Sequence, residues 1–139
     1  MKDAEKTIGN LIDKSRTSII SSVDSDGFPN TKAMLGVRKR DGIKHLYFST
    51  NTSSMRVKQY LKNPKACVYF YNDRFFRGTM LIGIMEVLQD EASRKSIWQL
   101  GDQLYYPKGV NDPDYAVLKF TATKGRYYNN FKSEDFKVP

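Results

Sequence analysis

The order of apolar and polar positions predicts a short helix followed by a β-hairpin. Residues 4–14 carry three apolar side chains at helical spacing, which is typical of an amphipathic helix. Residues 17–23 (TSIISSV) are β-like, and the run Asp24 to Gly27 predicts a turn before the next strand. The chain therefore starts with one helix and one pair of strands.

Two further strands are predicted over 30–38 and 44–49, joined by the tight turn Arg40-Asp41-Gly42, in which glycine supplies a positive φ. Three successive strands joined by two Asp-Gly turns predict an antiparallel meander. A helix is expected after the third strand, and it should end at Asn63-Pro64 because the residue before a proline disfavours helix.

The second half of the chain is predicted to be mainly β. A long strand has Gly83 at its centre, where a bulge or a barrel bend is expected. Six or seven strands with two or three short helices predict an α+β fold built on a small antiparallel β-barrel. The elements expected here are strands over 66–71, 75–88, 115–123 and 126–131, a helix over 92–100, and a turn at Lys124-Gly125.

Composition indicates one folded domain over residues 1–139. The chain has 139 residues, of which 40% are hydrophobic and 13% aromatic, which favours a globular protein over a disordered one. No apolar run approaches the roughly 20 residues of a membrane span. The single cysteine, Cys67, excludes an internal disulfide. We therefore expect a cytoplasmic protein without a membrane partner.

The net charge of +8 is concentrated in one part of the chain. The window 38–65 contains eight basic residues and one acidic residue, Asp41, so its net charge is +7. Such a patch attracts an anion, either a nucleic acid or a phosphorylated small molecule. The alternative is a solvated rim, which applies to four residues near turns: Lys39, Arg40, Lys44 and Lys65.

The segment 49–64 (STNTSSMRVKQYLKNP) carries the groups that a phosphate site requires. Hydroxyls, free backbone N–H groups and positive charge are expected together in the first turn of a helix that follows a strand. The residues concerned are Thr50, Thr52, Ser53, Ser54, Arg56 and Lys58.

Each of these residues also has a simpler explanation. Thr52 or Ser53 alone is better explained as a helix N-cap, and Arg56 on a helix surface as a solvated side chain. Lys32 is a sharper signal, because a lysine inside a half-apolar strand needs a partner or an exposed face. Met34 alone is more often core filler than a ligand contact.

The chain shows no catalytic site made only of protein groups. His45, the single histidine, lies in a predicted strand without a triad motif, and Cys67 lies in an apolar strand without a cationic cluster. One histidine and one cysteine do not favour a zinc site. If the protein is an enzyme, we expect the reactive atoms to belong to a cofactor.

Four segments in the same order resemble the pyridoxamine-phosphate-oxidase-like flavoproteins, the FMN-binding split β-barrels. The last of them is similar to the general-stress-protein branch of that family. The resemblance implies an antiparallel split β-barrel and a homodimer that binds two FMN molecules between its subunits. The segments are DGFPNTKAM at 26–34, LYFSTNTSSMR at 46–56, NPKACVYFY at 63–71 and WQLGDQLYYPKGVNDPDYAVLKF at 98–120.

The resemblance also implies which residues contact FMN. Ser54 and Arg56 would bind the phosphate with Lys32 opposite, although the family usually has arginine at the position of Lys32 and lysine at that of Arg56. Trp98 and nearby tyrosines would line the flavin pocket or, as is more common for such aromatic residues, pack in the core or at the dimer interface. The full expected set is Lys32, Ala33, Met34, Phe48, Ser49, Thr50, Ser54, Met55, Arg56, Gly78, Thr79 and Trp98.

A true pyridoxamine-phosphate oxidase is not expected. Such enzymes carry a C-terminal arginine and histidine that contact the substrate, and this chain ends YYNNFKSEDFKVP. The sequence therefore predicts an FMN-dependent oxidoreductase that acts on an unidentified small molecule. Two alternatives remain open: a non-catalytic flavin-binding or stress-related protein, and a basic β-barrel that binds single-stranded nucleic acid. The second ranks well behind, because the charge gathers at a helix start.

Overall fold

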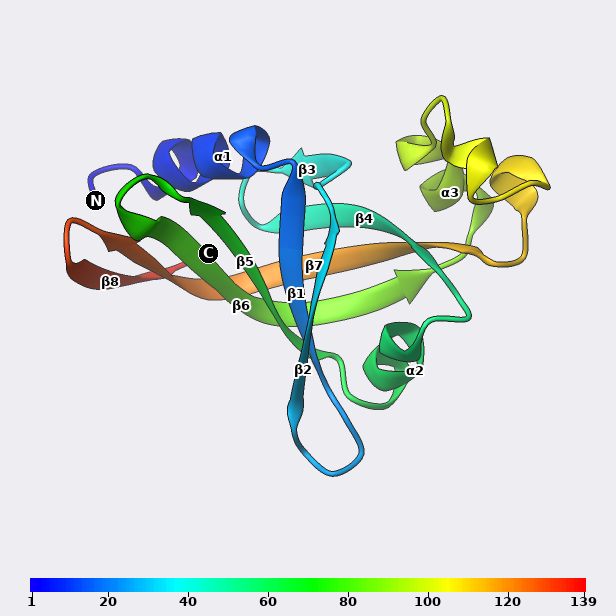
Figure 1. Cartoon of the computed structure of the whole chain (residues 1–139), viewed down its shortest axis with the longest axis horizontal. Coiled ribbons are helices and arrows are strands. Elements are labelled where there is room, and N and C mark those ends of the chain that lie inside the picture. The colour runs from blue at the N-terminus through cyan, green and yellow to red at the C-terminus, as the bar shows by residue number, and fades with distance from the viewer.

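A computed structural model describes residues 1–139, apart from the side chain of Phe75. It contains three α-helices and eight strands, with three short 3₁₀ helices (Figure 1). The α-helices are α1 (Ala4–Lys14), α2 (Met55–Lys62) and α3 (Glu91–Ile97), and the 3₁₀ helices are η1 (Arg74–Phe76), η2 (Asp102–Leu104) and η3 (Gly109–Asn111). The strands are β1 (Thr17–Val23), β2 (Pro29–Leu35), β3 (Lys39–Asp41), β4 (His45–Asn51), β5 (Lys65–Asn72), β6 (Arg77–Leu88), β7 (Tyr115–Asn129) and β8 (Lys132–Lys137).

The strands form one antiparallel sheet that does not close. Their order is β2-β1-β5-β6-β7-β4-β3, and β8 pairs with β7 beside this path. The sheet bends so strongly that β1 and β2 run across the direction of the long strands β6 and β7 (Figure 1). The predicted α+β split barrel is confirmed, with eight strands rather than six or seven.

The predicted three-stranded meander is wrong. The expected strand over 30–38 ends at Leu35, and this strand, β2, pairs only with β1. Arg40 and Asp41, which were expected in a turn, belong to β3, and β3 pairs with β4 at the other end of the sheet. The change of partner occurs at Gly36, where a Cβ atom would lie 3.0 Å from the carbonyl oxygen of Ser15. The backbone N–H of Arg38 then bonds the carbonyl of Tyr47 at 2.8 Å, which starts the new pairing.

The predicted turn at Lys124-Gly125 is also wrong, because both residues lie inside β7 and pair with β6. Gly125 has no side chain, and this leaves room for the ring of Phe136 on β8. The chain turns later, at Asn130 and Phe131, whose φ angles are 52° and 63°. Both residues therefore adopt the left-handed conformation of a type I′ hairpin turn.

The core lies inside the bent sheet and is closed at one end by α1. Asp3 caps this helix, because its carboxylate accepts a hydrogen bond from the N–H of Lys6 at 3.1 Å. Ile8, Leu11 and Ile12 pack into the core cluster. The predicted helix over 4–14 is therefore confirmed. No described helix is long and apolar enough to cross a membrane.

The bulge predicted at Gly83 is confirmed. The pairing of β6 with β7 shifts between Ile82, opposite Lys124, and Gly83, opposite Ala122, which leaves one residue of β7 unpaired. A Cβ atom on Gly83 would overlap the carbonyl of Thr121 and approach the Cα of Ala122 to 2.9 Å. Only glycine therefore allows the two longest strands to pair closely here.

We expect Gly83→Ala to lower the free energy of unfolding by about 3 kcal/mol, since backbone atoms must move to admit the methyl group. Urea unfolding followed by circular dichroism measures this change. Gly27→Asn is the control, because Gly27 has φ 85° with nothing within 4 Å, and asparagine tolerates such a turn. A Gly83→Ala protein as stable as the Gly27→Asn control would contradict the proposed close contact.

Candidate functional site

The helix α2 packs against the hairpin of β1 and β2 through polar contacts. Gln59 accepts a hydrogen bond from the hydroxyl of Ser22 on β1 and donates one to the Oδ1 atom of Asn30 on β2 at 3.1 Å. One residue further along the helix, the Tyr60 hydroxyl donates to the carbonyl of Ser21 at 3.0 Å. This face of α2 is therefore fixed against the inner side of the hairpin.

Arg56 lies on the same side of α2, three residues before Gln59 and four before Tyr60. Burial raises the pKa of the Tyr60 hydroxyl, and the nearby positive charge of Arg56 partly opposes this rise. The Nε atom of Arg56 is fully buried and has no hydrogen-bond partner among the described residues. A buried N–H group without a partner is unfavourable, so this guanidinium is suited to an added anion.

Lys32 on β2 faces the same side of the sheet as α2. Cross-strand partners share a face, and Lys32 pairs with Ile20 while Asn30 pairs with Ser22. Ile20 is fully buried and Asn30 contacts α2, so the side chain of Lys32 is directed to the inner face. It remains exposed because β2 is an edge strand.

Thr50 contributes a second unpaired polar group near the start of α2. It is only 4% exposed, and its Oγ1 atom has no hydrogen-bond partner among the described residues. Burying a hydroxyl without a partner costs about 1–3 kcal/mol. We call Lys32, Thr50, Ser54 and Arg56 together the α2 site.

The prediction that the hydroxyls between β4 and α2 gather in the first helical turn is wrong. Residues 49–51 belong to β4, and the helix begins only at Met55. Ser54 is the N-cap, because its Oγ atom accepts from the N–H of Val57 at 3.3 Å. The N-cap expected at Thr52 or Ser53 is therefore wrong by one residue.

Thr52 and Ser53 instead bind a carboxylate from the protein itself. The Oδ1 atom of Asp114 accepts hydrogen bonds from the Thr52 hydroxyl at 2.9 Å and from the Ser53 N–H at 3.0 Å. The N–H of Ser53 lowers the pKa of the Asp114 carboxyl most, burial opposes this, and the two hydroxyls lower it further. The carboxylate of Asp114 therefore already occupies the hydrogen-bond donors of this turn. Ser54 and Arg56 remain to bind an external phosphate.

Other expected contacts are placed in different surroundings. Phe48 and Thr79 are fully buried, and the Thr79 hydroxyl donates to the carbonyl of Arg126 at 3.1 Å. Gly78 lies under the Tyr69 ring, since a Cβ atom would come within 2.9 Å of the Tyr69 Cζ atom. These three residues thus have structural roles in the free protein.

Met55 is exposed at one end of a cleft of about 380 Å³ between α2 and the β1–β2 turn. Met34 is half-buried and packs against the core, on the same face of β2 as Lys32. Ala33 and Ser49 lie on the opposite, outer faces of their strands. The expected set is therefore divided between the inner and outer sides of the sheet.

Trp98 also lies on the outer side, in an aromatic cluster. It contacts the Tyr115 ring edge-on, with ring centroids 5.1 Å apart, and the Tyr106 ring at 6.3 Å. Burial raises the pKa of Tyr106 to about 12. Tyr115 pairs with Asn51, so this cluster covers the end of β4 two residues beyond Ser49.

The basic window is more strongly paired than a solvated rim would be. Arg38 forms a bidentate ion pair with Asp102, and Arg40 forms one with Asp13 at 2.7 and 2.8 Å. The alternative of a solvated rim is therefore wrong for Arg40. These pairs reduce the positive charge available to a nucleic acid.

The remaining candidate nucleophiles are unremarkable in their surroundings. His45 is half-buried with its Nδ1 atom 3.2 Å from the Thr121 hydroxyl. Cys67 is half-buried, and this burial raises the pKa of its thiol. Among the described residues, no group of three or more histidine, cysteine, aspartate or glutamate side chains is arranged to bind a metal ion.

Sequence reasoning missed three residues that organise this region: Gln59, Asp102 and Asp114. Each acts through a partner far away in the chain, such as Asp114 with Thr52, which are 62 positions apart. The only available signal was a polar residue inside an otherwise patterned segment. That signal does not identify the partner.

Since hydrogen bonds lower the pKa of Asp114, its stabilising effect is present above the ordinary value near 3.9 and is lost as pH falls through the lowered value. We expect Asp114→Asn to lower the free energy of unfolding by about 1 kcal/mol at pH 7. The difference from wild type should shrink at pH 3, as urea unfolding at both pH values would show. An equal difference at the two pH values would contradict this role.

Comparisons with known proteins agree with this fold. The family model described as "Pyridoxamine 5'-phosphate oxidase" matches residues 4–129. A protein from Clostridium acetobutylicum related to general stress protein 26 of B. subtilis (pyridoxinephosphate oxidase family) has a crystal structure that is 41% identical in sequence. The alignment covers 97% of this chain and 94% of that one, with a TM-score of 0.88. No curated protein sequence matches significantly.

More distant structures share the fold alone. General Stress Protein 26 from Bacillus anthracis is 19% identical, with 96% of this chain and 98% of that chain covered and a TM-score of 0.80. A heme binding protein from Mycobacterium smegmatis is 11% identical, with 99% of this chain and 59% of that chain covered and a TM-score of 0.78. The family match and the 41% identity together show that the chain belongs to the pyridoxamine 5'-phosphate oxidase family, in its general-stress-protein branch.

Proposed function

We propose that this protein is a homodimeric FMN-binding oxidoreductase that acts on a small molecule. The observation that carries this proposal is that two of the four buried side-chain polar atoms without partners among the described residues, the Nε atom of Arg56 and the Oγ1 atom of Thr50, belong to this region. Both flank the strand-to-helix turn after β4, and Lys32 is directed to the same inner face. An anionic ligand would satisfy these groups.

The α2 site fits the phosphate of FMN. A dianionic phosphate requires cations and hydrogen-bond donors, and the site offers two cations from separate elements, Arg56 on α2 and Lys32 on β2. Arginine provides a planar fork of donors, whereas lysine provides a point charge that adapts its position. The Thr50 hydroxyl would add a donor next to the phosphate.

When bound, FMN supplies hydride and electron transfer at its isoalloxazine ring. The residues of this chain would bind and orient that ring and set its polarity. The backbone of β2 beside Met34 and that of β4 at Ser49 would offer N–H and C=O groups for this role. Trp98, half-buried beside the end of β4, would limit access of water on that side.

The outer face of the sheet supports the dimer. Ala33, Ile19, Tyr69 and Met80 are successive cross-strand partners on β2, β1, β5 and β6, so they form one continuous apolar row. Tyr69 remains 37% exposed, and Ile84, four residues beyond Met80 on β6, is 46% exposed. A contiguous exposed apolar surface of this kind is typical of a protein interface, and a second copy of the chain is the partner proposed here.

The main alternative function is that of a protein that binds flavin but catalyses no reaction. Reduction of the bound flavin by NADH or NADPH, followed by turnover with an acceptor, separates an enzyme from a protein that only binds flavin. The absorption spectrum of the purified protein provides a prior test, because flavin and haem have different spectra. A haem spectrum without flavin would contradict the proposal.

We expect Lys32→Ala combined with Arg56→Ala to weaken FMN binding at least about 100-fold, since each cation contact contributes about 1.5–3 kcal/mol. Affinity for riboflavin, which lacks the phosphate, should change much less. Fluorescence titration of each ligand measures both effects. This comparison separates loss of phosphate contacts from damage to the ring site.

The matched control for this variant is Lys62→Ala combined with Lys65→Ala, which removes the same charge from exposed positions at the end of α2 and the start of β5. The control should bind FMN within about threefold of wild type, because exposed charges are screened by salt. Equal losses of FMN affinity in the two variants would reject the α2 site. Unchanged FMN affinity in the Lys32/Arg56 variant would reject it as well.

The wild-type protein is expected to sediment as a dimer, and Ile19→Glu as a monomer, because the variant places a charge in the apolar row. Phe131→Glu is the control, since Phe131 is exposed at the β7–β8 turn away from this row. Analytical ultracentrifugation distinguishes the two states. A monomeric wild type, or a dimeric Ile19→Glu protein, would contradict the proposed interface.

A further inference from the structure

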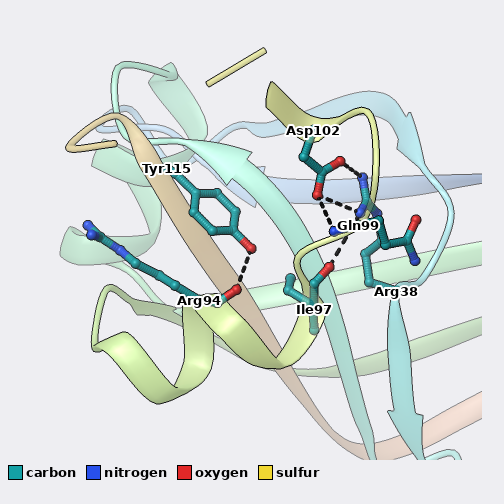
Figure 2. A network of polar contacts seen from close by, with 6 residues as sticks. All are labelled: Arg38, Arg94, Ile97, Gln99, Asp102 and Tyr115. Carbon is teal, nitrogen blue, oxygen red and sulfur yellow. Dashed lines mark hydrogen bonds and ion pairs between the residues drawn. The ribbon is translucent and has the colours of Figure 1, made fainter. Parts of the chain in front are cut away.

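A buried ion pair joins two segments that are distant in the sequence. The guanidinium of Arg38 lies in the connection from β2 to β3, and the carboxylate of Asp102 lies at the start of η2 (Figure 2). The Nη1 and Nη2 atoms donate to the two carboxylate oxygens at 2.9 and 2.8 Å. Both side chains are nearly inaccessible, with 10% and 5% of their surfaces exposed.

The same two side chains also hold the backbone on both sides of Trp98. Arg38 donates to the carbonyl of Ile97 at 3.4 Å, and Asp102 accepts from the N–H of Gln99 at 2.8 Å (Figure 2). These contacts explain why α3 stops at Ile97 although a helix was predicted to residue 100. The N–H of Gln99 is directed to a carboxylate instead of to a helical carbonyl.

The turn that follows Trp98 has little packing of its own. Leu100 is fully exposed, and Gly101 has φ 98°, in the left-handed region. The carbonyl of Asp102 accepts from the N–H groups of Tyr105 and Tyr106 at 2.9 and 3.0 Å, so the next turn starts at the same residue whose carboxylate binds Arg38. The position of Trp98 therefore depends strongly on Asp102.

Burial would raise the pKa of Asp102, but the hydrogen bonds from Arg38 and Gln99 outweigh burial and lower it. An ion pair in such a site adds little net stability, because both charges lose their hydration. Hydrophobic residues of similar size would often stabilise the fold as well. What the pair provides is direction, since a fork of two parallel hydrogen bonds allows only one arrangement of the two segments.

We propose that the Arg38–Asp102 pair is a positioning element that holds Trp98 against the end of β4 and thereby shapes the outer side of the flavin site. Trp98 packs on Tyr115, which pairs with Asn51 at the end of β4. Figure 2 shows the hydroxyl of Tyr115 donating to the carbonyl of Arg94, at 2.9 Å. The effect on flavin rests on the proposed function. The effect on Trp98 does not.

Trp98 is the only tryptophan of the chain, so its fluorescence reports this segment directly. In flavin-free protein we expect Asp102→Asn to increase acrylamide quenching of Trp98 at least twofold and to shift its emission to the red. In the FMN-loaded protein, the same variant should lower FMN affinity about tenfold and increase the fluorescence of the bound flavin. Arg38→Lys, which keeps the charge but loses the fork, should have an intermediate effect.

A double variant, Arg38→Leu with Asp102→Leu, separates positioning from stability, because it removes both charges and leaves neither one buried alone. It should recover most of the melting temperature lost in Asp102→Asn but neither the Trp98 quenching nor the FMN affinity of wild type. Asp13→Asn, which breaks the half-exposed pair with Arg40, is the matched control and should change neither signal. A double variant with wild-type quenching and affinity would overturn the proposal.

Failure of this inference differs from failure of the proposed function. If wild-type protein does not bind FMN, the proposed function fails, while Trp98 quenching in flavin-free protein still decides the positioning claim. If Asp102→Asn leaves Trp98 quenching unchanged, the positioning claim fails whatever FMN does. If quenching changes but FMN affinity and flavin fluorescence do not, the pair positions Trp98 without shaping the flavin site, which also overturns the proposal.

Discussion

The contact between α2 and the β1–β2 hairpin is the interaction on which the proposed site depends. Gln59 bridges Ser22 and Asn30, and the Tyr60 hydroxyl binds the backbone of β1. Because a helix presents residues three and four positions apart on one side, this contact also directs Arg56 toward the hairpin. Two cations from separate elements can therefore act on one anion only while this packing holds.

The free protein leaves this region incompletely satisfied. Most turns here use the chain's own acceptors, as Asp114 does for Thr52 and Ser53. Thr50 and Arg56 differ, because each has a buried polar atom without a partner among the described residues. Such atoms cost stability, and a bound anion would offset that cost. The contrast supports the proposal that a ligand binds at Arg56 rather than at the hydroxyl-rich turn before it.

The periodicity of the sequence was sufficient to predict local structure, such as the helix at 4–14 and the bulge at Gly83. It could not predict pairing partners, because the same alternation suits a strand paired on either side. The change of partner at Gly36 and the continuation of β7 through Gly125 depend on close contacts with distant segments. The contacts of Asp102 and Asp114 span 64 and 62 positions, so only the folded chain shows them.

A crystal structure of the protein grown with excess FMN is the most direct test of the central claim. The claim predicts phosphate oxygens within hydrogen-bond distance of both the Arg56 guanidinium and the Lys32 ammonium group, with the Asp114 carboxylate still bound to Thr52 and Ser53. Flavin bound with its phosphate elsewhere, or a site between α2 and β2 that stays without ligand under saturating FMN, would contradict it.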